Sequence, residues 1–90
     1  MLSEYEALRA ESQKQLSDFL RVELDIGATF VQSALLARSE NHTDHFIQAT
    51  GNAVKAAASI RHFMNQLADS SVRIEIEHKL AALDRQISEL

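Results

Sequence analysis

Apolar residues recur with a helical period in three segments of this chain, which are separated by two short polar links. In the first segment, residues 3–38, the apolar positions form one broad arc when plotted at about 100° per residue. In the second, residues 42–68, they cover about two-thirds of the circumference, and in the third, residues 71–89, they form a narrow seam. The chain has no proline and two glycines, so it has few places to turn. The pattern predicts an all-α fold.

Residues that cap helices stand at each predicted start. Ser3, with Glu6 three residues later, forms a capping-box pattern. Asn41 is the predicted N-cap of the second helix, with Thr43 as the competing cap, and the run "DSS" at 69–71 precedes the third helix. Because both links are short, neighbouring helices should run antiparallel. We expect a single domain, residues 1–90, with a long first helix, a central alanine-rich second helix and a shorter capping third helix.

The predicted helices differ in length. A helix of about 36 residues spans about 54 Å, whereas one of about 25 residues spans about 37 Å. The first dozen residues of the first helix should therefore extend beyond the other two. They either project into solvent or are covered by another copy of the chain.

The middle of the second helix is made of small residues, "ATGNAVKAAASI" at 49–60. Glycine inside a helix costs about 1 kcal/mol relative to alanine, and close packing against another backbone would compensate for it. An antiparallel hairpin that turns near residues 39–40 places Gly27 and Gly51 at a similar level. We expect the first two helices to approach most closely there, so leucine at either position should lower the melting temperature.

Two charged residues interrupt the apolar sectors. Glu23 lies in the apolar arc of the first helix, and Arg61 lies in that of the second. The simplest interpretation is a half-buried ion pair that fixes the helix register, within one chain or between two chains. The alternative is a functional carboxylate at Glu23.

The histidines are the only candidate metal ligands besides the acids. His42 and His45 stand three residues apart at a helix start and offer two ligands, so a metal would need a third from a neighbour. Glu75 and His78 have the Glu-x-x-His spacing of di-metal helical bundles, but His78 lies opposite the apolar seam of its helix. We expect solvated surface residues at all these positions, and no cofactor.

Charge and composition exclude several classes of function. Nine basic residues stand against thirteen acidic ones, for a net charge of −4, and nucleic-acid binding needs a basic face. No stretch approaches the run of about eighteen apolar residues that spans a membrane. The acidic start "MLSEYEALRAESQKQ" is unlike a signal peptide, so we expect a cytoplasmic protein. Without cysteine, a phosphate-binding loop or a nucleophile motif, the chain is not expected to be an enzyme.

The first two predicted helices resemble a tetratricopeptide-type helical hairpin. The resemblance rests on bulky residues in the first helix and alanines in the second, with the third helix placed like a terminal cap. The proline after the second helix and the repeat unit of roughly 34 residues are missing. The resemblance therefore implies a mode of helix packing and no binding residues.

The apolar surface exceeds what three helices of these lengths are expected to bury against one another. We therefore expect a non-enzymatic helical protein that acts through protein–protein contacts as a homo-oligomer, with a dimer as the first expectation. The residues predicted to form the interface are Tyr5, Leu8, Phe19, Val22, Leu36 and Phe63. Two alternatives stay open. One is a protein that binds a small ligand or a metal through Glu23 or the His42–His45 pair, and the other is a regulatory module that binds a larger protein.

Overall fold

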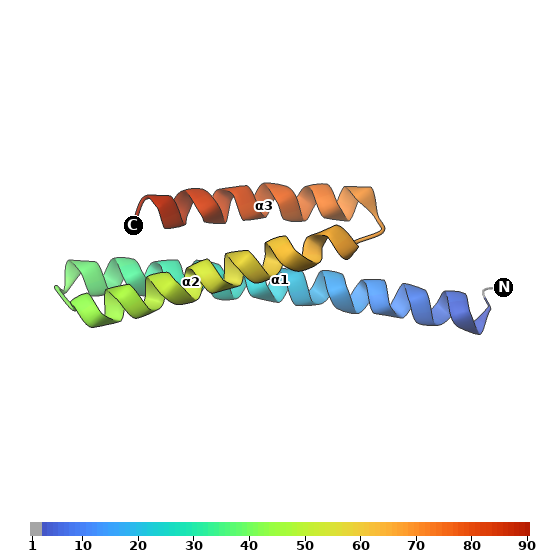
Figure 1. The fold of residues 1–90 in the computed structure, drawn as a ribbon, viewed down its shortest axis with the longest axis horizontal. Coiled ribbons are helices and arrows are strands. Elements are labelled where there is room, and N and C mark those ends of the chain that lie inside the picture. The colour runs from blue at the N-terminus through green and yellow to red at the C-terminus, as the bar shows by residue number, and fades with distance from the viewer. Residues whose placement is uncertain (1–2) are drawn as a thin grey trace.

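The computed structural model describes residues 3–90, which form three α-helices and one short 3₁₀ turn. The helices are α1 (Glu4–Ser39), α2 (Thr43–Phe63) and α3 (Ser70–Ser88), and the 3₁₀ turn η1 (Met64–Gln66) follows α2. α1 and α2 form an antiparallel hairpin, and α3 turns back to run antiparallel to α2 (Figure 1). The all-α fold with a long first helix is confirmed for the described residues. Residues 1 and 2 of the predicted domain lie outside them.

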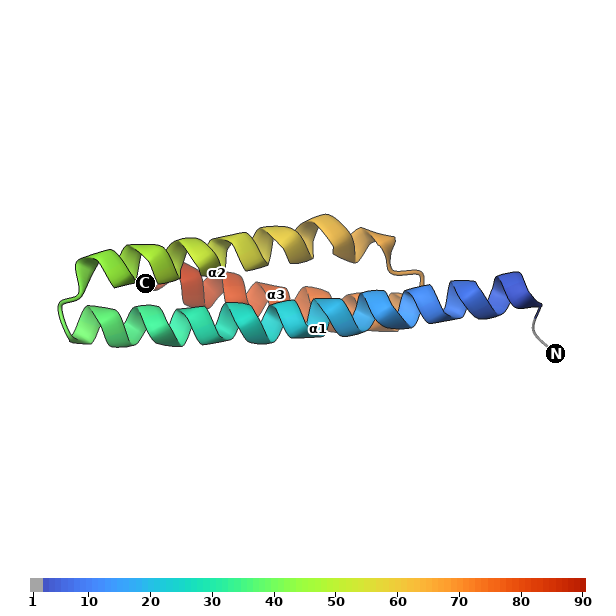
Figure 2. The same ribbon diagram turned by 90° about the horizontal axis from the view of Figure 1, so that it is seen from below.

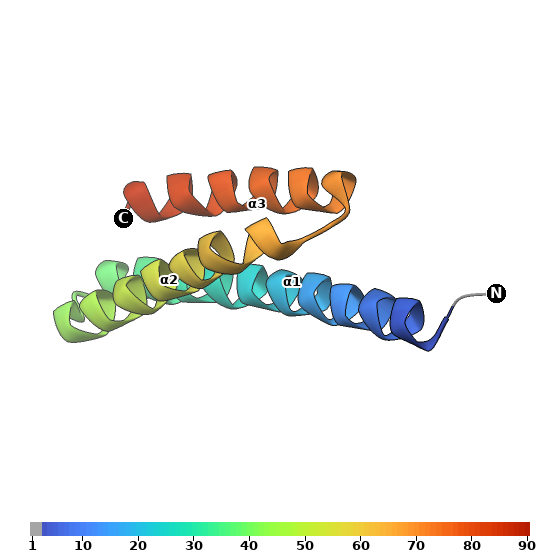
Figure 3. The same cartoon turned by 45° about the vertical axis from the view of Figure 1, so that its right-hand side comes forward.

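The third helix packs on one face of the hairpin. In Figure 1 it lies above the hairpin, and in the perpendicular view of Figure 2 it lies behind the gap between α1 and α2. Figure 3 shows the same order from a third direction. The largest fully buried side chains, Leu20, Val31, Ile60 and Ile76, come from all three helices. The core therefore lies along the line where the three helices meet, and the face of the hairpin opposite α3 has no further layer of described residues.

Two of the three predicted caps are confirmed. Ser3 Oγ accepts a hydrogen bond from the Glu6 amide at 3.2 Å, which begins α1. Asp69 begins α3, because its carboxylate accepts hydrogen bonds from the amides of Ser71 at 2.8 Å and Val72 at 3.3 Å. Each cap satisfies amide groups that have no partner within the helix.

The predicted N-cap role of Asn41 is wrong, because Asn41 ends α1 and does not begin α2. Its φ of 59° lies in the left-handed region, which asparagine tolerates better than most residues. The His42 amide donates to the Ala37 carbonyl at 2.8 Å, and the Asn41 amide donates to the Arg38 carbonyl at 3.2 Å. These two bonds form a Schellman motif. α2 then starts at Thr43, with His42 at the N-cap position and no capping bond from its side chain.

The second helix is also shorter than predicted. It ends at Phe63 and not near residue 68, and η1 leads the chain toward α3. The backbone of this link is held by Gln13 of α1, whose side chain donates to the Gln66 carbonyl at 3.1 Å and accepts from the Ala68 amide at 2.8 Å. A single glutamine thus satisfies two main-chain groups that helix geometry leaves unpaired.

The first helix extends beyond the other two, as predicted (Figure 2). All residues from 3 to 12 are exposed. The molecule measures 59 × 19 × 15 Å, and its radius of gyration is 16.0 Å. A compact domain of this length would have a radius of gyration of about 12 Å. Within one chain, the N-terminal third of α1 therefore has hardly any packing partner.

Candidate interaction surface

The first helix carries two separate rows of apolar side chains. One row is buried in the core and includes Leu20, Leu24 and Val31. The other is centred roughly 150° further round the helix and is exposed. We call this second row the α1 stripe; it consists of Tyr5, Leu8, Phe19, Val22, Ile26 and Leu36. All the exposed large hydrophobic side chains described in α1 belong to it.

The α1 stripe follows the spacing of a coiled coil. From residue 5 to residue 36 the steps alternate between three and four, and the positions between stripe residues are Ser12, Gln15, Thr29 and Ser33. Two helices pack together along such a row with a period of about 3.5 residues. On a straight helix the row drifts by about 20° per heptad, which a left-handed supercoil removes. The stripe can therefore receive one further helix along most of α1.

Five of the six residues predicted for the interface lie on this stripe. The sixth, Phe63 of α2, is half-buried, and its ring packs edge to face on Phe19 with centroids 5.8 Å apart. Ile26 was not among the predicted residues, because the broad apolar arc of the sequence placed it with the core. The alternating steps of three and four could have identified it. That these residues contact another chain stays a prediction.

Charged and polar residues border the α1 stripe differently on its two sides. On the side away from α2 lie Glu4, Glu11, Asp18 and Asp25, which recur every seven residues, are all exposed and are here called the acidic edge. On the other side lies the α2 polar strip, defined as Gln48, Asn52, Lys55, Ser59 and His62. The only acidic residue in α2 is Asp44, in its first turn. The border away from α2 is therefore mainly acidic, with Asp18 paired to Lys14 of its own helix at 3.3 Å. The border beside α2 carries Lys55 and His62, together with the half-buried Glu23 of α1.

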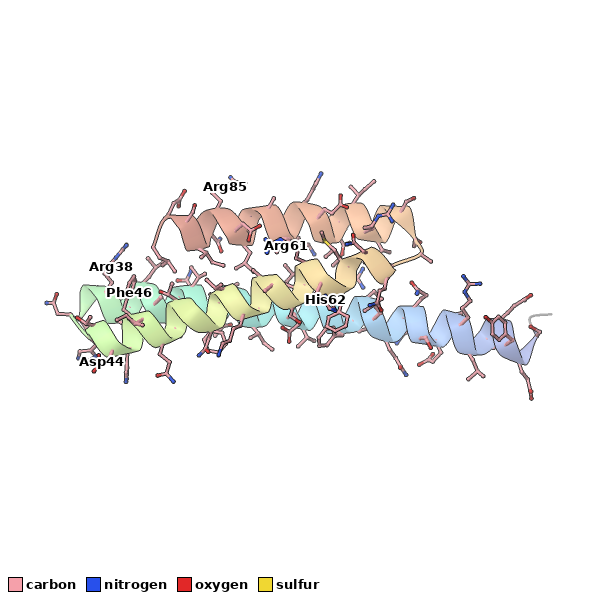
Figure 4. All side chains as sticks on the ribbon, in the orientation of Figure 1. Arg38, Asp44, Phe46, Arg61, His62 and Arg85 are labelled. Atoms are coloured by element: carbon pink, nitrogen blue, oxygen red, sulfur yellow. The ribbon has the colours of Figure 1, made fainter. Side chains whose placement is uncertain are left out.

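A shallow groove separates the two helices on this face. It is lined by Phe30 and Ser33 of α1 and by His45, Gln48, Ala49 and Asn52 of α2. At the other end of α2, His62 points to the face opposite α3, whereas Arg61 points toward α3 (Figure 4). The His62 ring lies 4.7 Å from that of Phe63, centroid to centroid. The stripe and the α2 polar strip thus form one face of the hairpin.

The predicted pairing of the two glycines is wrong. A Cβ built on Gly51 would meet nothing within 4 Å, and this residue is exposed. Gly27 is buried, but its close neighbour is Leu83 of α3, whose Cδ2 would lie 2.7 Å from an added Cβ. The next helix contact is Ala56 Cβ at 3.4 Å. The turn occupies residues 40–42, later than predicted, so the level of Gly27 falls at Ala56 and five residues from Gly51. Distance from the turn also does not set the side of the helix on which a residue lies, and Gly51 lies on an exposed side.

Within one chain, the predicted ion pair between Glu23 and Arg61 does not form, and Glu23 is half-buried. A pair between two chains stays a prediction. Arg61 Nη2 lies 2.7 Å from Asp84 Oδ2 of α3, and both side chains are about half exposed. A second ion pair joins Arg21 Nε of α1 to Glu75 Oε2 of α3 at 3.1 Å. Both interhelical pairs attach α3 to the hairpin. Their acidic partners, Glu75 and Asp84, lie on α3, for which the sequence predicted no ion pair with another helix.

The candidate metal ligands do not form a metal site within residues 3–90. His42 and His45 pack edge to face with ring centroids 5.9 Å apart, and His42 Nδ1 lies 3.6 Å from Glu40 Oε2. No group of three or more ligating side chains comes together in the described part of the chain. Glu75, of the Glu75–His78 pair, instead contacts Arg21 and lies 3.8 Å from Lys79 Nζ.

Two carboxylates in or beside α3 have shifted pKa values. A hydrogen bond from the Ser71 hydroxyl, with those from the amides of Val72 and Ser71, lowers the pKa of Asp69 below its ordinary value. A hydrogen bond from Arg21, together with the charges of Arg21 and Lys79, lowers the pKa of Glu75. In each case the partner favours the charged form. Both shifts belong to groups that hold α3 in place.

Comparison with protein-family models, curated proteins and solved structures found no match to this chain. The likeness to tetratricopeptide hairpins therefore gains no support beyond the hairpin geometry itself. None of the helices among residues 3–90 has both the length and the apolar character that crossing a membrane requires.

Proposed function

We propose that this is a non-enzymatic helical protein that acts by self-association through the α1 stripe. The observation that carries the proposal is the separation of the two apolar rows of α1. The side chains of the core row are buried within the chain, whereas the six large side chains of the stripe are exposed to solvent. Val22 is 54% exposed and Leu36 is 59% exposed.

The regularity of the stripe favours a helix as the occupant. Scattered exposed apolar residues are normal on protein surfaces and need no explanation. A row that keeps steps of three and four through about four and a half heptads is instead the pattern of helix pairing. The α1 helix of a second copy offers a row of the same length and period, and a homodimer uses the same patch on both chains.

Light scattering tests this proposal. We expect the wild type at micromolar concentration to have twice the 10.1 kDa mass of one chain. Val22→Glu places a charge in the middle of the stripe and should give a monomer that is still helical by circular dichroism. The matched control is Ile47→Glu, because Ile47 is 63% exposed on α2 and lies off the stripe. A monomeric wild type would refute self-association, and a dimeric Val22→Glu would refute the stripe as its site.

A further inference from the structure

Resting on the proposed self-association, we infer that the two copies pair in parallel, so that the acidic edge of each α1 lies along the α2 polar strip of the other copy. The two-fold axis would run along the helices. The evidence is the order of residues across the hairpin face: acidic edge, apolar stripe, then polar strip.

The stripe itself favours a parallel pair. In a parallel pair in register, each position meets its own copy, so Phe19, Val22 and Ile26 meet apolar side chains. The polar position Gln15 likewise meets Gln15. In an antiparallel pair about the middle of the stripe, Gln15 faces Ile26 and Leu8 faces Ser33. That arrangement buries polar groups against apolar ones, which costs free energy.

The charges beside the stripe favour the same orientation. In an antiparallel pair the two acidic edges meet, which places Asp18 beside Asp25 of the other copy. In a parallel pair each acidic edge faces the opposite border, where α2 lies. α2 has no acidic residue after Asp44, and its polar strip carries Lys55 and His62. Parallel pairing therefore keeps the two acidic edges apart and brings each one toward Lys55 and His62, although it also places Asp18 near the half-buried Glu23 of the other copy.

The heights along the hairpin agree with this pairing. Ala56 of α2 lies level with Gly27 of α1, since an added Gly27 Cβ would be 3.4 Å from Ala56 Cβ. Lys55 is next to Ala56, and Asp25 is two residues from Gly27, or about 3 Å along the axis. Because α2 runs antiparallel to α1, Lys55 lies on the other side of this level from Asp25, so in a parallel pair in register the two residues are about 4.5 Å apart along the axis, a separation that a lysine side chain can span. By the same reasoning, Asp18 of one copy lies about 3 Å along the axis from His62 of the other, because Phe63 contacts Phe19.

Parallel pairing also gives the overhang of α1 a partner. Both overhanging segments then leave the body at the same end. Tyr5 and Leu8 supply the apolar positions of a short two-stranded coiled coil. Glu4 and Arg9 take the flanking positions that form ion pairs between the helices of such a coil.

Cysteine cross-linking tests the orientation, because the natural chain has no cysteine. Ser12→Cys lies on the row and, in a parallel pair, brings its two copies to within roughly the 4.4–6.8 Å Cα separation of a disulfide. Ala10→Cys is the matched control, since it is exposed on the same overhang but off the row. We expect mild oxidation to link Ser12→Cys chains to one another and to leave Ala10→Cys chains largely unlinked.

The other outcomes distinguish a wrong orientation from a wrong proposal of self-association. If Ser12→Cys chains do not link to themselves but do link to Thr29→Cys chains, the pairing is antiparallel and only the orientation is refuted. Equal linking of the Ser12→Cys and Ala10→Cys chains would also refute it, because random collision would then explain both. If neither links and the wild type is monomeric by light scattering, the proposed function fails as well.

A charge exchange tests the contact between the acidic edge and the α2 polar strip. Asp25→Lys and Lys55→Glu should each weaken the dimer about two- to five-fold, as expected for exposed charge pairs. The double variant restores opposite charges across the interface and should regain most of the wild-type affinity. A double variant that is weaker than either single variant would refute the contact. Both residues are exposed, so circular dichroism should show the folded helix content throughout.

Discussion

Gly27 of α1 lies directly against Leu83 of α3, where a Cβ on the glycine would approach Leu83 Cδ2 to 2.7 Å. This contact lets α3 come close to α1 in the middle of the bundle. Because Leu83 is itself buried, there is no free space for a large side chain at position 27. It must push α3 outward or force Leu83 from its rotamer.

Gly27→Leu should therefore lower the free energy of unfolding by about 1–3 kcal/mol, the usual cost of overpacking a core. Chemical denaturation of both proteins at one fixed concentration measures the difference. Gly27→Ala should cost less, because the crowded atom is the end of a flexible side chain. Equal stability of Gly27→Leu and the wild type would show that α3 does not pack here.

Gly51 should behave in the opposite way. It is exposed in the middle of α2, and an added Cβ would meet nothing within 4 Å. Gly51→Ala should raise the free energy of unfolding by about 1 kcal/mol, because alanine loses less backbone entropy in a helix. Thermal melts at matched concentration would detect the rise. A loss of stability would mean that another backbone approaches this glycine, as the sequence had suggested.

The contrast between the two glycines shows how much of this fold the sequence specifies. The helical period gave the three helices, and the lengths of the segments gave the overhang of α1. Neither the period nor the lengths predict the rotation of each helix about its own axis. Gly27 faces a neighbouring helix, whereas Gly51 lies on an exposed side of α2, five residues from Ala56, the residue that is level with Gly27.

The position of the candidate surface likewise depends on helix rotation, which the sequence pattern does not predict. The apolar arc of α1 is wide enough to face two neighbours, and the sequence does not say which part α2 and α3 leave uncovered. Arg61 likewise has its ion-pair partner on α3 and not on α1, because of the direction in which α2 is turned. The N-cap prediction for Asn41 is wrong for another reason. Asparagine suits both an N-cap and the left-handed residue of a Schellman motif, so the residue type does not distinguish them.

Asn41 offers a local test of the turn between α1 and α2. Its φ of 59° is costly for a β-branched residue and free for glycine. Asn41→Val should lower the free energy of unfolding by about 1–2 kcal/mol. Asn41→Gly should leave stability unchanged or slightly higher, and it serves as the matched control. If the two variants were equally stable by denaturation, the left-handed conformation at this position would be refuted.

The ion pair between Arg61 and Asp84 should contribute little to stability. Its atoms are 2.7 Å apart, but the side chains are 53% and 45% exposed, so water screens the charges. Arg61→Ala should cost less than about 1 kcal/mol in a denaturation experiment. A double-mutant cycle with Asp84→Ala isolates the pair. A coupling free energy well above that value would mean that the pair is less exposed in solution, as it would be if a second chain covered it.

Acid should weaken the attachment of α3. The pKa values of Asp69 and Glu75 are lowered in the folded chain from their ordinary 3.8 and 4.5, so their charged forms stabilise it. This contribution is fully present above those ordinary values and is lost as the pH falls through the lowered ones. We expect the free energy of unfolding to fall as the pH is lowered from about 5 toward 2.

The double variant Asp69→Asn, Glu75→Gln tests this assignment. It keeps a capping side chain at 69, because asparagine is also a good N-cap, but it removes both titrations. Its stability should depend less on pH, so the gap between the two proteins should narrow toward pH 2. A gap that stays constant from pH 7 to pH 2 would show that these carboxylates do not control the acid response.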